Sequence, residues 1–287
     1  MGEPTLIPNL TPSQFIGSNF FGFVQCVVQA PSPTTPAGYI GLLAIKLGGR
    51  LVCPGGVFEG FFFSQELRFA LRNGYKLLSI SQAYQFEVGV NTFTDLIQTL
   101  NTMKVEAQAN NQSALRNIAK LLMNSMYGRF GMHVDNTRAQ ILTHGQAAAI
   151  LNSYVVTNVI PLGGLKLISY IVNPSVSFTP QGQGWRRSGW ALPGQTNVPI
   201  AAAITAYSRM LINEFKLLAM DLGLDLYYSD TDSLVVNGAL PEQYIDSATL
   251  GQLKLEHVLE EGYFVAPKVY WLKTGEWAET HRIQRKV

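Results

Sequence analysis

Cysteine and charge are both scarce in this chain of 287 residues. Its two cysteines, Cys26 and Cys53, are too few for a disulfide framework and lack the spacing of zinc ligands. Only 14% of the residues are charged and 47% are hydrophobic, which argues against a disordered chain. A chain of this length can bury a sizeable core in one large domain or two modest ones.

The sequence also lacks a long apolar run and a recognisable leader. Its longest apolar stretch, residues 147–162, is interrupted by polar side chains, so no membrane span is expected. The N-terminus has neither a charged segment before an apolar core nor an arginine-rich segment, so no targeting peptide is visible. These absences predict a folded protein with no membrane partner.

Acidic residues are missing from the middle of the chain. Residues 107–213 carry eight bases and one acid, whereas residues 214–287 carry twelve acids and seven bases. A basic stretch followed by an acidic one suggests a surface for a polyanion beside a cation-binding site. Uneven surface charge without any partner explains the same pattern equally well.

Apolar periodicity and turn residues predict the local structure. The helix expected over residues 114–126 has Ser113 as its candidate N-cap and an apolar stripe of Leu115, Ile118, Leu122 and Met126. The other expected elements are a strand over 20–28, a hairpin over 50–60, a helix over 64–73, a strand over 75–86, a helix over 92–109, an irregular stretch over 161–198, a helix over 199–219 and a hairpin over 224–236.

The helix expected over residues 114–126 also has a cationic stripe. Arg116, Lys120 and Asn124 are spaced by four and therefore share one helix face, which Tyr127 and Gly128 continue. Cations suit the phosphates of a triphosphate, and an aromatic ring beside a bare glycine lets a base approach closely. A solvated helix face with an ordinary stop is the simpler explanation of the spacing alone.

Two aspartates lie at positions i and i+2 between two apolar segments. Asp230 and Asp232 belong to the string Tyr-Ser-Asp-Thr-Asp-Ser, residues 228–233, and alternate residues of an extended chain share one side. Two carboxylates this close repel each other unless a cation neutralises them, and oxygen ligands favour Mg²⁺. The alternative is a hairpin whose aspartates only form the turn.

In this order the motifs resemble those of family B DNA polymerases. Lys-Leu-Leu-Met-Asn-Ser-Met-Tyr-Gly, residues 120–128, is similar to the fingers helix motif of that family, and residues 228–233 to its palm metal motif. Lys-Val-Tyr, residues 268–270, and the stretch over 60–75 look like the protein-primed branch of phages, linear plasmids and organelles. The resemblance covers nearly the whole chain.

The resemblance implies an α+β fold with a palm, fingers and a truncated thumb. The palm would combine an antiparallel sheet with packed helices, and the fingers would be helical. Its implied boundaries are 1–91 for the first palm part with a hairpin insertion, 92–131 for the fingers, 132–270 for the second palm part with the metal hairpin, and 271–287 for the start of the thumb.

The resemblance also implies a function and a role for individual residues. The chain would be a DNA-directed DNA polymerase that transfers a nucleotide from a dNTP to a primer 3′-hydroxyl with two Mg²⁺ ions. The main metal ligand and catalytic residue would be Asp232, with Asp230 alongside. The dNTP would be bound by Lys120, Asn124, Tyr127 and Gly128, with Lys104 as a second fingers lysine. The primer or DNA would be contacted by Lys268, Tyr270 and Arg209. An ordinary edge strand is the alternative for Lys268 and Tyr270.

The implied partners are primer–template DNA and dNTPs. A terminal priming protein and an upstream polymerase fragment are further candidates. A mitochondrial location would follow from the resemblance to organellar and linear-plasmid enzymes.

One expected motif is missing. The family carries another metal-binding aspartate, followed by Ser-Leu-Tyr-Pro, before the region that matches residue 1, yet the first aspartate here is Asp95. We therefore expect a fragment that does not extend a primer by itself, with Glu3, Glu59 and Glu66 as the first candidates to replace that acid. The alternative is a catalytically inactive remnant that still binds DNA or nucleotide. An unrelated two-carboxylate hydrolase is disfavoured, because it needs no nucleotide-selecting helix.

Overall fold

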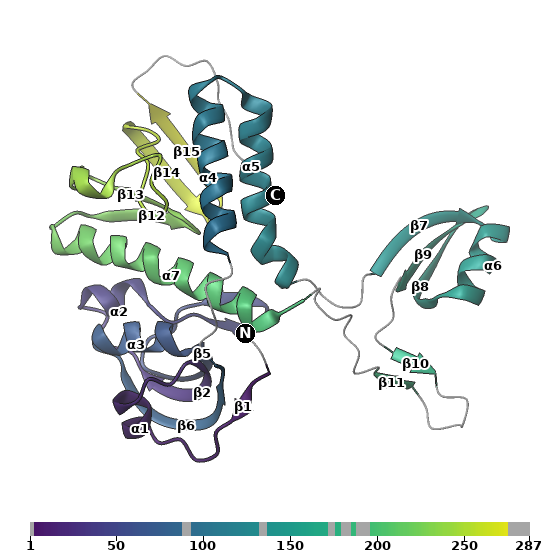
Figure 1. Cartoon of the computed structure of the whole chain (residues 1–287), viewed down its shortest axis with the longest axis horizontal. Helices are drawn as coiled ribbons and strands as arrows, with labels where there is room; N and C mark the ends of the chain where they lie inside the picture. Colours follow the sequence, from purple (N-terminus) through teal and green to yellow (C-terminus); the bar gives the residue numbers. More distant parts are fainter. Residues whose placement is uncertain are drawn as a thin grey trace. The chain divides into compact units, whose positions relative to one another are not determined.

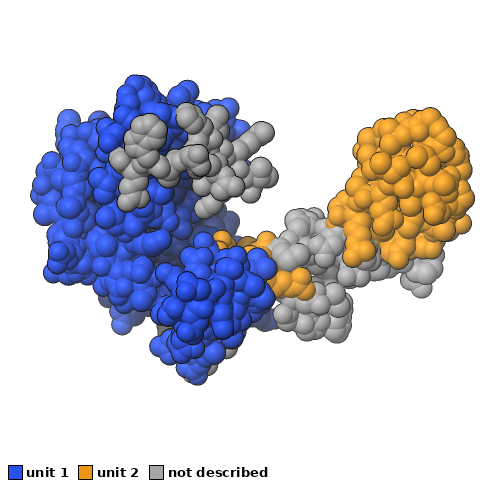
Figure 2. Space-filling model, turned by 90° about the horizontal axis from the view of Figure 1, so that it is seen from above, with its two compact units in different colours: residues 1–122, 202–287 blue, residues 123–201 orange. Residues whose placement is uncertain are grey.

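The computed structural model describes residues 3–87, 93–131, 137–171, 176–178, 185–187 and 196–274. The chain forms two compact units, residues 1–122 with 202–287 and residues 123–201 (Figure 2). These units divide the second expected palm part, because residues 132–201 belong to the smaller unit. Most of the expected thumb lies beyond Thr274 and outside the described residues, so the palm, fingers and thumb boundaries stay predictions.

A four-stranded antiparallel sheet organises the N-terminal part of the larger unit (Figure 1). Its strand order is β1-β6-β2-β5, and the strands predicted over 20–28 and 75–86 are both present as β2 and β6. The predicted helix over 64–73 is present as α3. The bounds are β1 (Thr5–Leu6), α1 (Pro12–Gly17), β2 (Gly22–Gln29), α2 (Pro36–Ile40), β5 (Val57–Phe63), α3 (Ser64–Arg72) and β6 (Lys76–Gln85).

Both faces of this sheet carry buried apolar side chains. On one face Val24 and Val28 of β2 pack in a cluster with Leu67 of α3. On the other face Phe23 and Phe63 cluster with two alanines of the long helix α7 (Val198–Asp221). Burial on both faces explains why β2 reads as an almost continuous apolar run rather than an alternating one.

The hairpin predicted over residues 50–60 is wrong. Strand β4 (Arg50–Val52) pairs instead with the preceding β3 (Ile45–Leu47), while β5 pairs with β2. The turn between β3 and β4 consists of Gly48 and Gly49, whose φ angles are 57° and 80°. A two-residue hairpin of this kind requires positive φ at both positions, and glycine adopts it without strain.

Two helices, α4 (Thr94–Ala109) and α5 (Ser113–Phe130), follow the sheet and run side by side in Figure 1. The predicted helix over 92–109 is confirmed. The second helix begins at Ser113, which is therefore helical rather than a cap, and continues beyond residue 126. Its expected apolar stripe is largely exposed, and Ile118 is 52% accessible to solvent.

Helix α7 (Val198–Asp221) joins the sheet to the C-terminal hairpins. Ala203 and Ala206 pack on the aromatic cluster of the sheet. The rings of Phe215 and Tyr244 pack edge to face, with their centroids 6.1 Å apart. The helix predicted over 199–219 and the hairpin predicted over 224–236 are both confirmed. The bounds are β12 (Leu226–Asp230), β13 (Ser233–Val236), η1 (Glu242–Tyr244), β14 (Leu259–Ala266) and β15 (Val269–Thr274).

The smaller unit contains a three-stranded antiparallel sheet in the order β7-β9-β8. A capping box of Thr143 and Gln146 starts its helix α6, which packs through Ala147 on Ile168 of the sheet. The expectation of irregular structure from residue 161 is wrong for β9, because Gly163, at φ 61°, forms a tight turn rather than a loop. The bounds are β7 (Thr137–Thr143), α6 (His144–Ser153), β8 (Val155–Leu162), β9 (Leu165–Ile171), β10 (Val176–Phe178) and β11 (Trp185–Arg187).

Among the described residues, no helix is long and apolar enough to cross a membrane.

The two cysteines test the burial of β2 in the larger unit. Cys26 lies in β2 and is 1% exposed, and burial, with a smaller contribution from Glu59, raises the pKa of its thiol to about 12. Cys53 lies on the surface. Burial also raises the pKa of the Cys53 thiol, but only Cys53 is accessible to a reagent. We expect iodoacetamide at pH 8 to alkylate Cys53 in the folded chain and Cys26 only after denaturation, because the reagent must reach the thiol and the thiolate is the reactive form. Peptide mass spectrometry measures both sites, and equal alkylation in the folded chain would contradict the burial of β2.

Candidate active site

The two predicted metal-binding aspartates lie at the tip of the β12–β13 hairpin. Asp230 pairs with Ser233, so Thr231 and Asp232 form the two-residue loop. The φ angle of Thr231 is 56°, and the N–H of Asp232 donates to the Asp230 carbonyl oxygen over 2.7 Å. A β-branched residue rarely adopts positive φ, and such backbone strain clusters at functional sites.

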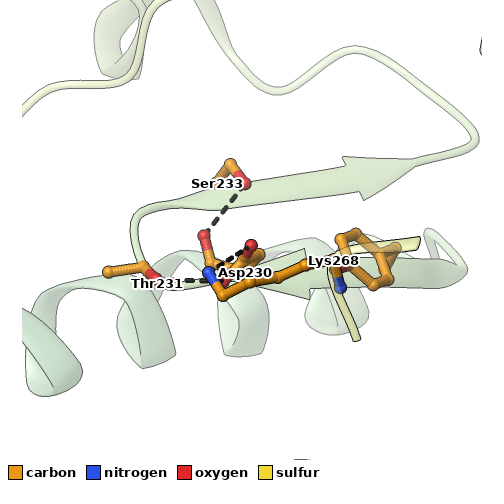
Figure 3. A network of polar contacts seen from close by, with 5 residues as sticks. Asp230, Thr231, Ser233 and Lys268 are labelled. Carbon is orange, nitrogen blue, oxygen red and sulfur yellow. Dashed lines mark hydrogen bonds and ion pairs between the residues drawn. The ribbon is translucent and has the colours of Figure 1, made fainter. Parts of the chain in front are cut away.

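Hydrogen bonds within the hairpin fix Asp230 (Figure 3). The Thr231 hydroxyl donates to Asp230 Oδ1 over 3.0 Å, and the Ser233 hydroxyl donates to the Asp230 carbonyl oxygen over 3.0 Å. The Asp230 side chain is 29% exposed, whereas Asp232 is an exposed residue. The hairpin therefore holds one carboxylate in place and presents the other to solvent.

Lys268 completes this network from a distant part of the chain. Its Nζ lies 2.9 Å from Asp230 Oδ1 and 3.0 Å from Asp230 Oδ2. The hydrogen bond to the carboxylate is the main cause that raises the pKa of Lys268. Lys268 occupies the turn between β14 and β15 at φ 63°, so the alternative of an ordinary edge strand does not hold for this residue.

Tyr228 joins the two hairpins, and this role could not be read from the motif. Its hydroxyl oxygen accepts the Lys268 backbone N–H over 2.8 Å. Its ring stacks on Phe264 with centroids 4.9 Å apart and also contacts Tyr270 at 5.4 Å. The structure thus brings three predicted site residues, Asp230, Lys268 and Tyr270, together around Tyr228.

The hairpin carboxylates suit part of a metal site. In the part of the chain that the structure describes, no group of three or more His, Cys, Asp or Glu side chains could hold an ion. Asp230 and Asp232 offer carboxylate oxygens, which hard divalent cations prefer, and Asp230 already holds a cationic group. Two such ligands fit an ion that keeps several of its waters, rather than a closed cage.

Glu66 and Arg209 form an ion pair elsewhere in the same unit. Arg209 Nε and Nη2 lie 2.6 Å and 2.9 Å from the two oxygens of Glu66, whose side chain is 3% exposed. This bidentate bond ties α3 to α7 and is the main cause that raises the pKa of Arg209. Glu66 is therefore engaged and does not fit the role of the missing metal ligand. A contact between Arg209 and DNA stays a prediction.

Three cations gather on the α4–α5 helices. Burial lowers the pKa of Lys104, and the nearby positive charges of Arg116 and Lys120 lower it further. Arg116 also donates from Nε to Gln108 Oε1 over 3.2 Å. The structure thus places Lys104, predicted from the family resemblance, beside the cationic stripe, and an anion at this cluster would relieve the repulsion.

The other predicted nucleotide-binding residues lie further along α5, within the smaller unit. Asn124, Tyr127 and Gly128 are all exposed. A side-chain carbon added at Gly128 would meet no described atom within 4 Å, so local packing does not require glycine there. The role of these three residues stays a prediction.

Comparison with known proteins identifies the family of the chain. A family model described as "DNA polymerase type B, organellar and viral" matches residues 1–216. A probable DNA polymerase of Podospora anserina is 34% identical over 267 residues, covering 89% of this chain and 21% of the relative. A probable DNA polymerase of Ascobolus immersus is 34% identical over 273 residues, covering 92% of this chain and 21% of the relative. The chain thus spans about a fifth of the length of these relatives.

The fold itself is similar to solved polymerase structures. Phi29 DNA polymerase complexed with primer-template DNA superposes with a TM-score of 0.59 at 18% identity, covering 94% of this chain and 41% of that one. Its ternary complex with primer-template DNA and incoming nucleotide substrates also gives 0.59 at 18% identity, covering 94% of this chain and 42% of that one. The expected family B α+β fold is confirmed. The chain belongs to the organellar and viral type B DNA polymerases.

Proposed function

We propose that this chain carries out nucleotidyl transfer in a DNA-directed DNA polymerase. The observation that carries the proposal is the strained hairpin loop, with Asp232 exposed in the loop and the preceding Asp230 carboxylate paired with the Lys268 ammonium. The name of the relatives supports the same activity. The substrates would be a dNTP and the 3′-hydroxyl of a primer paired with template DNA.

The metal in this proposal is Mg²⁺, held by Asp232 and Asp230. When bound, Mg²⁺ stabilises the charge of the triphosphate and favours the ionised primer hydroxyl. Asp232 is the more exposed of the two residues and presents its carboxylate from the loop, whereas Asp230 is fixed by Thr231 and by the backbone of the turn. Tyr228 and Phe264 orient the turn that carries Lys268, close to where the primer end would lie.

The test of the activity uses a chimera in which this chain replaces the matching segment of the Podospora anserina relative. We expect the chimera to extend a primer by the nucleotide complementary to the template, in preference to the other three. Gel analysis of single-nucleotide incorporation measures this preference. Addition that ignores the template, or none at all, would contradict the proposal.

The cluster of Lys104, Arg116 and Lys120 would hold the triphosphate. We expect Lys104→Ala and Lys120→Ala each to weaken dNTP binding about tenfold, because a charge-assisted hydrogen bond to phosphate is lost. Fluorescence anisotropy with a labelled dNTP measures this affinity. Lys166→Ala, which removes a lysine from the smaller unit, is the matched control and should change it little.

A second measurement separates this role from a general loss of structure. Binding of primer–template DNA should change much less than dNTP binding in Lys120→Ala. An equal loss of both affinities would assign Lys120 to the duplex or to the fold, and not to the nucleotide.

A catalytically inactive segment that only binds DNA or nucleotide is the second candidate. The lack of a third metal-ligating side chain near the hairpin, among the residues described, favours it. Binding without template-dependent extension by the chimera would support this candidate. A terminal priming protein and an upstream polymerase fragment as partners, and a mitochondrial location, are further proposals that rest on the family.

A further inference from the structure

The ion pair between Lys268 and Asp230 occupies the carboxylate that a metal ion would need. Both Asp230 oxygens lie within 3.0 Å of the lysine nitrogen. The two residues are 38 positions apart in sequence, so the contact is made by the fold and not by the local chain. The lysine backbone is held separately, because its N–H donates to the hydroxyl oxygen of Tyr228.

We propose that Lys268 is an exchangeable counter-ion of the hairpin. It neutralises Asp230 in the metal-free chain and releases this carboxylate when a divalent cation binds. The inference rests on the proposed metal site and adds a residue that controls access to it.

Exchange follows from the geometry of one carboxylate with two competing cations. A magnesium-sized ion needs a carboxylate oxygen at about 2 Å. The Lys268 ammonium already lies close to both Asp230 oxygens, so the ion and the ammonium would meet at short distance with like charges. A doubly charged ion attracts the carboxylate more strongly than an ammonium does. The lysine side chain is the group that can move away, into solvent.

The lysine is also free to move at low cost. Its side chain is 55% exposed, and solvent-exposed ion pairs contribute little to stability. Four methylene groups separate the charge from a backbone that Tyr228 keeps in place. The ammonium therefore swings away from Asp230 while the β14–β15 turn stays where it is.

Release of the ammonium couples two binding events. An uncoupled Lys268 beside the hairpin is available to an anion such as a primer phosphate. Because coupling between two ligands is reciprocal, a divalent cation would favour binding of the phosphate, and the phosphate would favour binding of the cation. Lys268 thus couples metal binding to primer binding, in addition to contacting the primer.

The test measures how accessible the Lys268 amine is while Mn²⁺ is added to the 287-residue chain. Brief acylation with an N-hydroxysuccinimide ester is quantified at each lysine by peptide mass spectrometry, and electron paramagnetic resonance reports bound Mn²⁺. We expect the acylation rate of Lys268 to rise at least about fivefold, the lower end of the usual coupling between two ligands. The rise should have its midpoint at the same Mn²⁺ concentration as Mn²⁺ binding.

Lys273 is the matched control, because it forms an ion pair with Glu260 at 3.0 Å in the same pair of strands and has similar exposure. Its acylation should not respond to Mn²⁺. In Asp230→Asn the Lys268 amine should react rapidly without Mn²⁺. Lys268→Met should bind Mn²⁺ more tightly than the unchanged chain, whereas Lys273→Met should not.

Each outcome decides the proposal. Mn²⁺ binding with constant Lys268 reactivity, and with unchanged affinity in Lys268→Met, overturns the exchange and leaves the metal site intact. Mn²⁺ binding that is detectable only in Lys268→Met also overturns the exchange, because the ion then does not displace the lysine from Asp230. No binding in either protein overturns the exchange in this chain, whereas the proposed metal site is tested separately by Asp232→Asn in the chimera.

Discussion

Asp232→Asn should reduce the rate of single-nucleotide incorporation by a factor of about a thousand or more, because loss of a metal ligand removes several kcal/mol of transition-state stabilisation. Asparagine keeps the size of the side chain and the shape of the turn but removes the charge that attracts the ion. The assay is rapid-quench primer extension by the chimera at saturating dNTP, so that weaker dNTP binding does not lower the measured rate.

The control for this variant is Asp221→Asn, which removes an exposed carboxylate at the end of α7. Its rate should stay close to that of the unchanged chimera. A loss of less than tenfold in Asp232→Asn would show that the hairpin carboxylate is not a catalytic metal ligand. Other residues of the polymerase would then have to bind the metal ions.

Arg209→Met should lower the free energy of unfolding of the larger unit by about 3 kcal/mol, the lower end for breaking a buried ion pair. The substitution leaves the Glu66 carboxylate buried, at 3% exposure, without its bidentate partner. The lower end applies because the arginine side chain itself is 37% exposed. Hydrogen exchange of the amides in β2, β5 and β6 measures this stability independently of the smaller unit.

Two further variants show whether the pair itself is responsible. Lys273→Met breaks the exposed pair with Glu260 and should change the stability by no more than about 0.5 kcal/mol. Glu66→Leu combined with Arg209→Met should recover part of the loss, because no unpaired charge stays buried. A change of less than about 1 kcal/mol in Arg209→Met would contradict a structural role for the pair.

Local signals in the sequence predicted much of the fold. The helix over residues 64–73 was predicted from apolar periodicity and turn residues, and the structure ends α3 at Arg72, with Asn73 as its C-cap and Gly74 next at φ 92°. The β12–β13 hairpin was predicted because two short apolar segments flank the turn at residues 230–233. Motif order was enough to identify the polymerase family, since each motif is a short contiguous string.

Long-range pairing could not be predicted in the same way. The contact from Lys268 to Asp230 and the contact from Glu66 to Arg209 join residues 38 and 143 positions apart. Such contacts depend on tertiary packing, which periodicity and turn propensity do not predict. The exposure of the apolar stripe of α5, including Ile118, could not be predicted for the same reason, because the pattern alone does not say what a helix packs against.

Anomalous diffraction from Mn²⁺ locates the metal site, in crystals of the chimera with primer–template DNA and a non-hydrolysable dNTP. We expect a Mn²⁺ peak at about 2 Å from a carboxylate oxygen of Asp232 and in contact with the triphosphate. We also expect that the Lys268 nitrogen no longer contacts Asp230. Peaks that touch neither Asp230 nor Asp232 would contradict the assignment of this hairpin as the metal site.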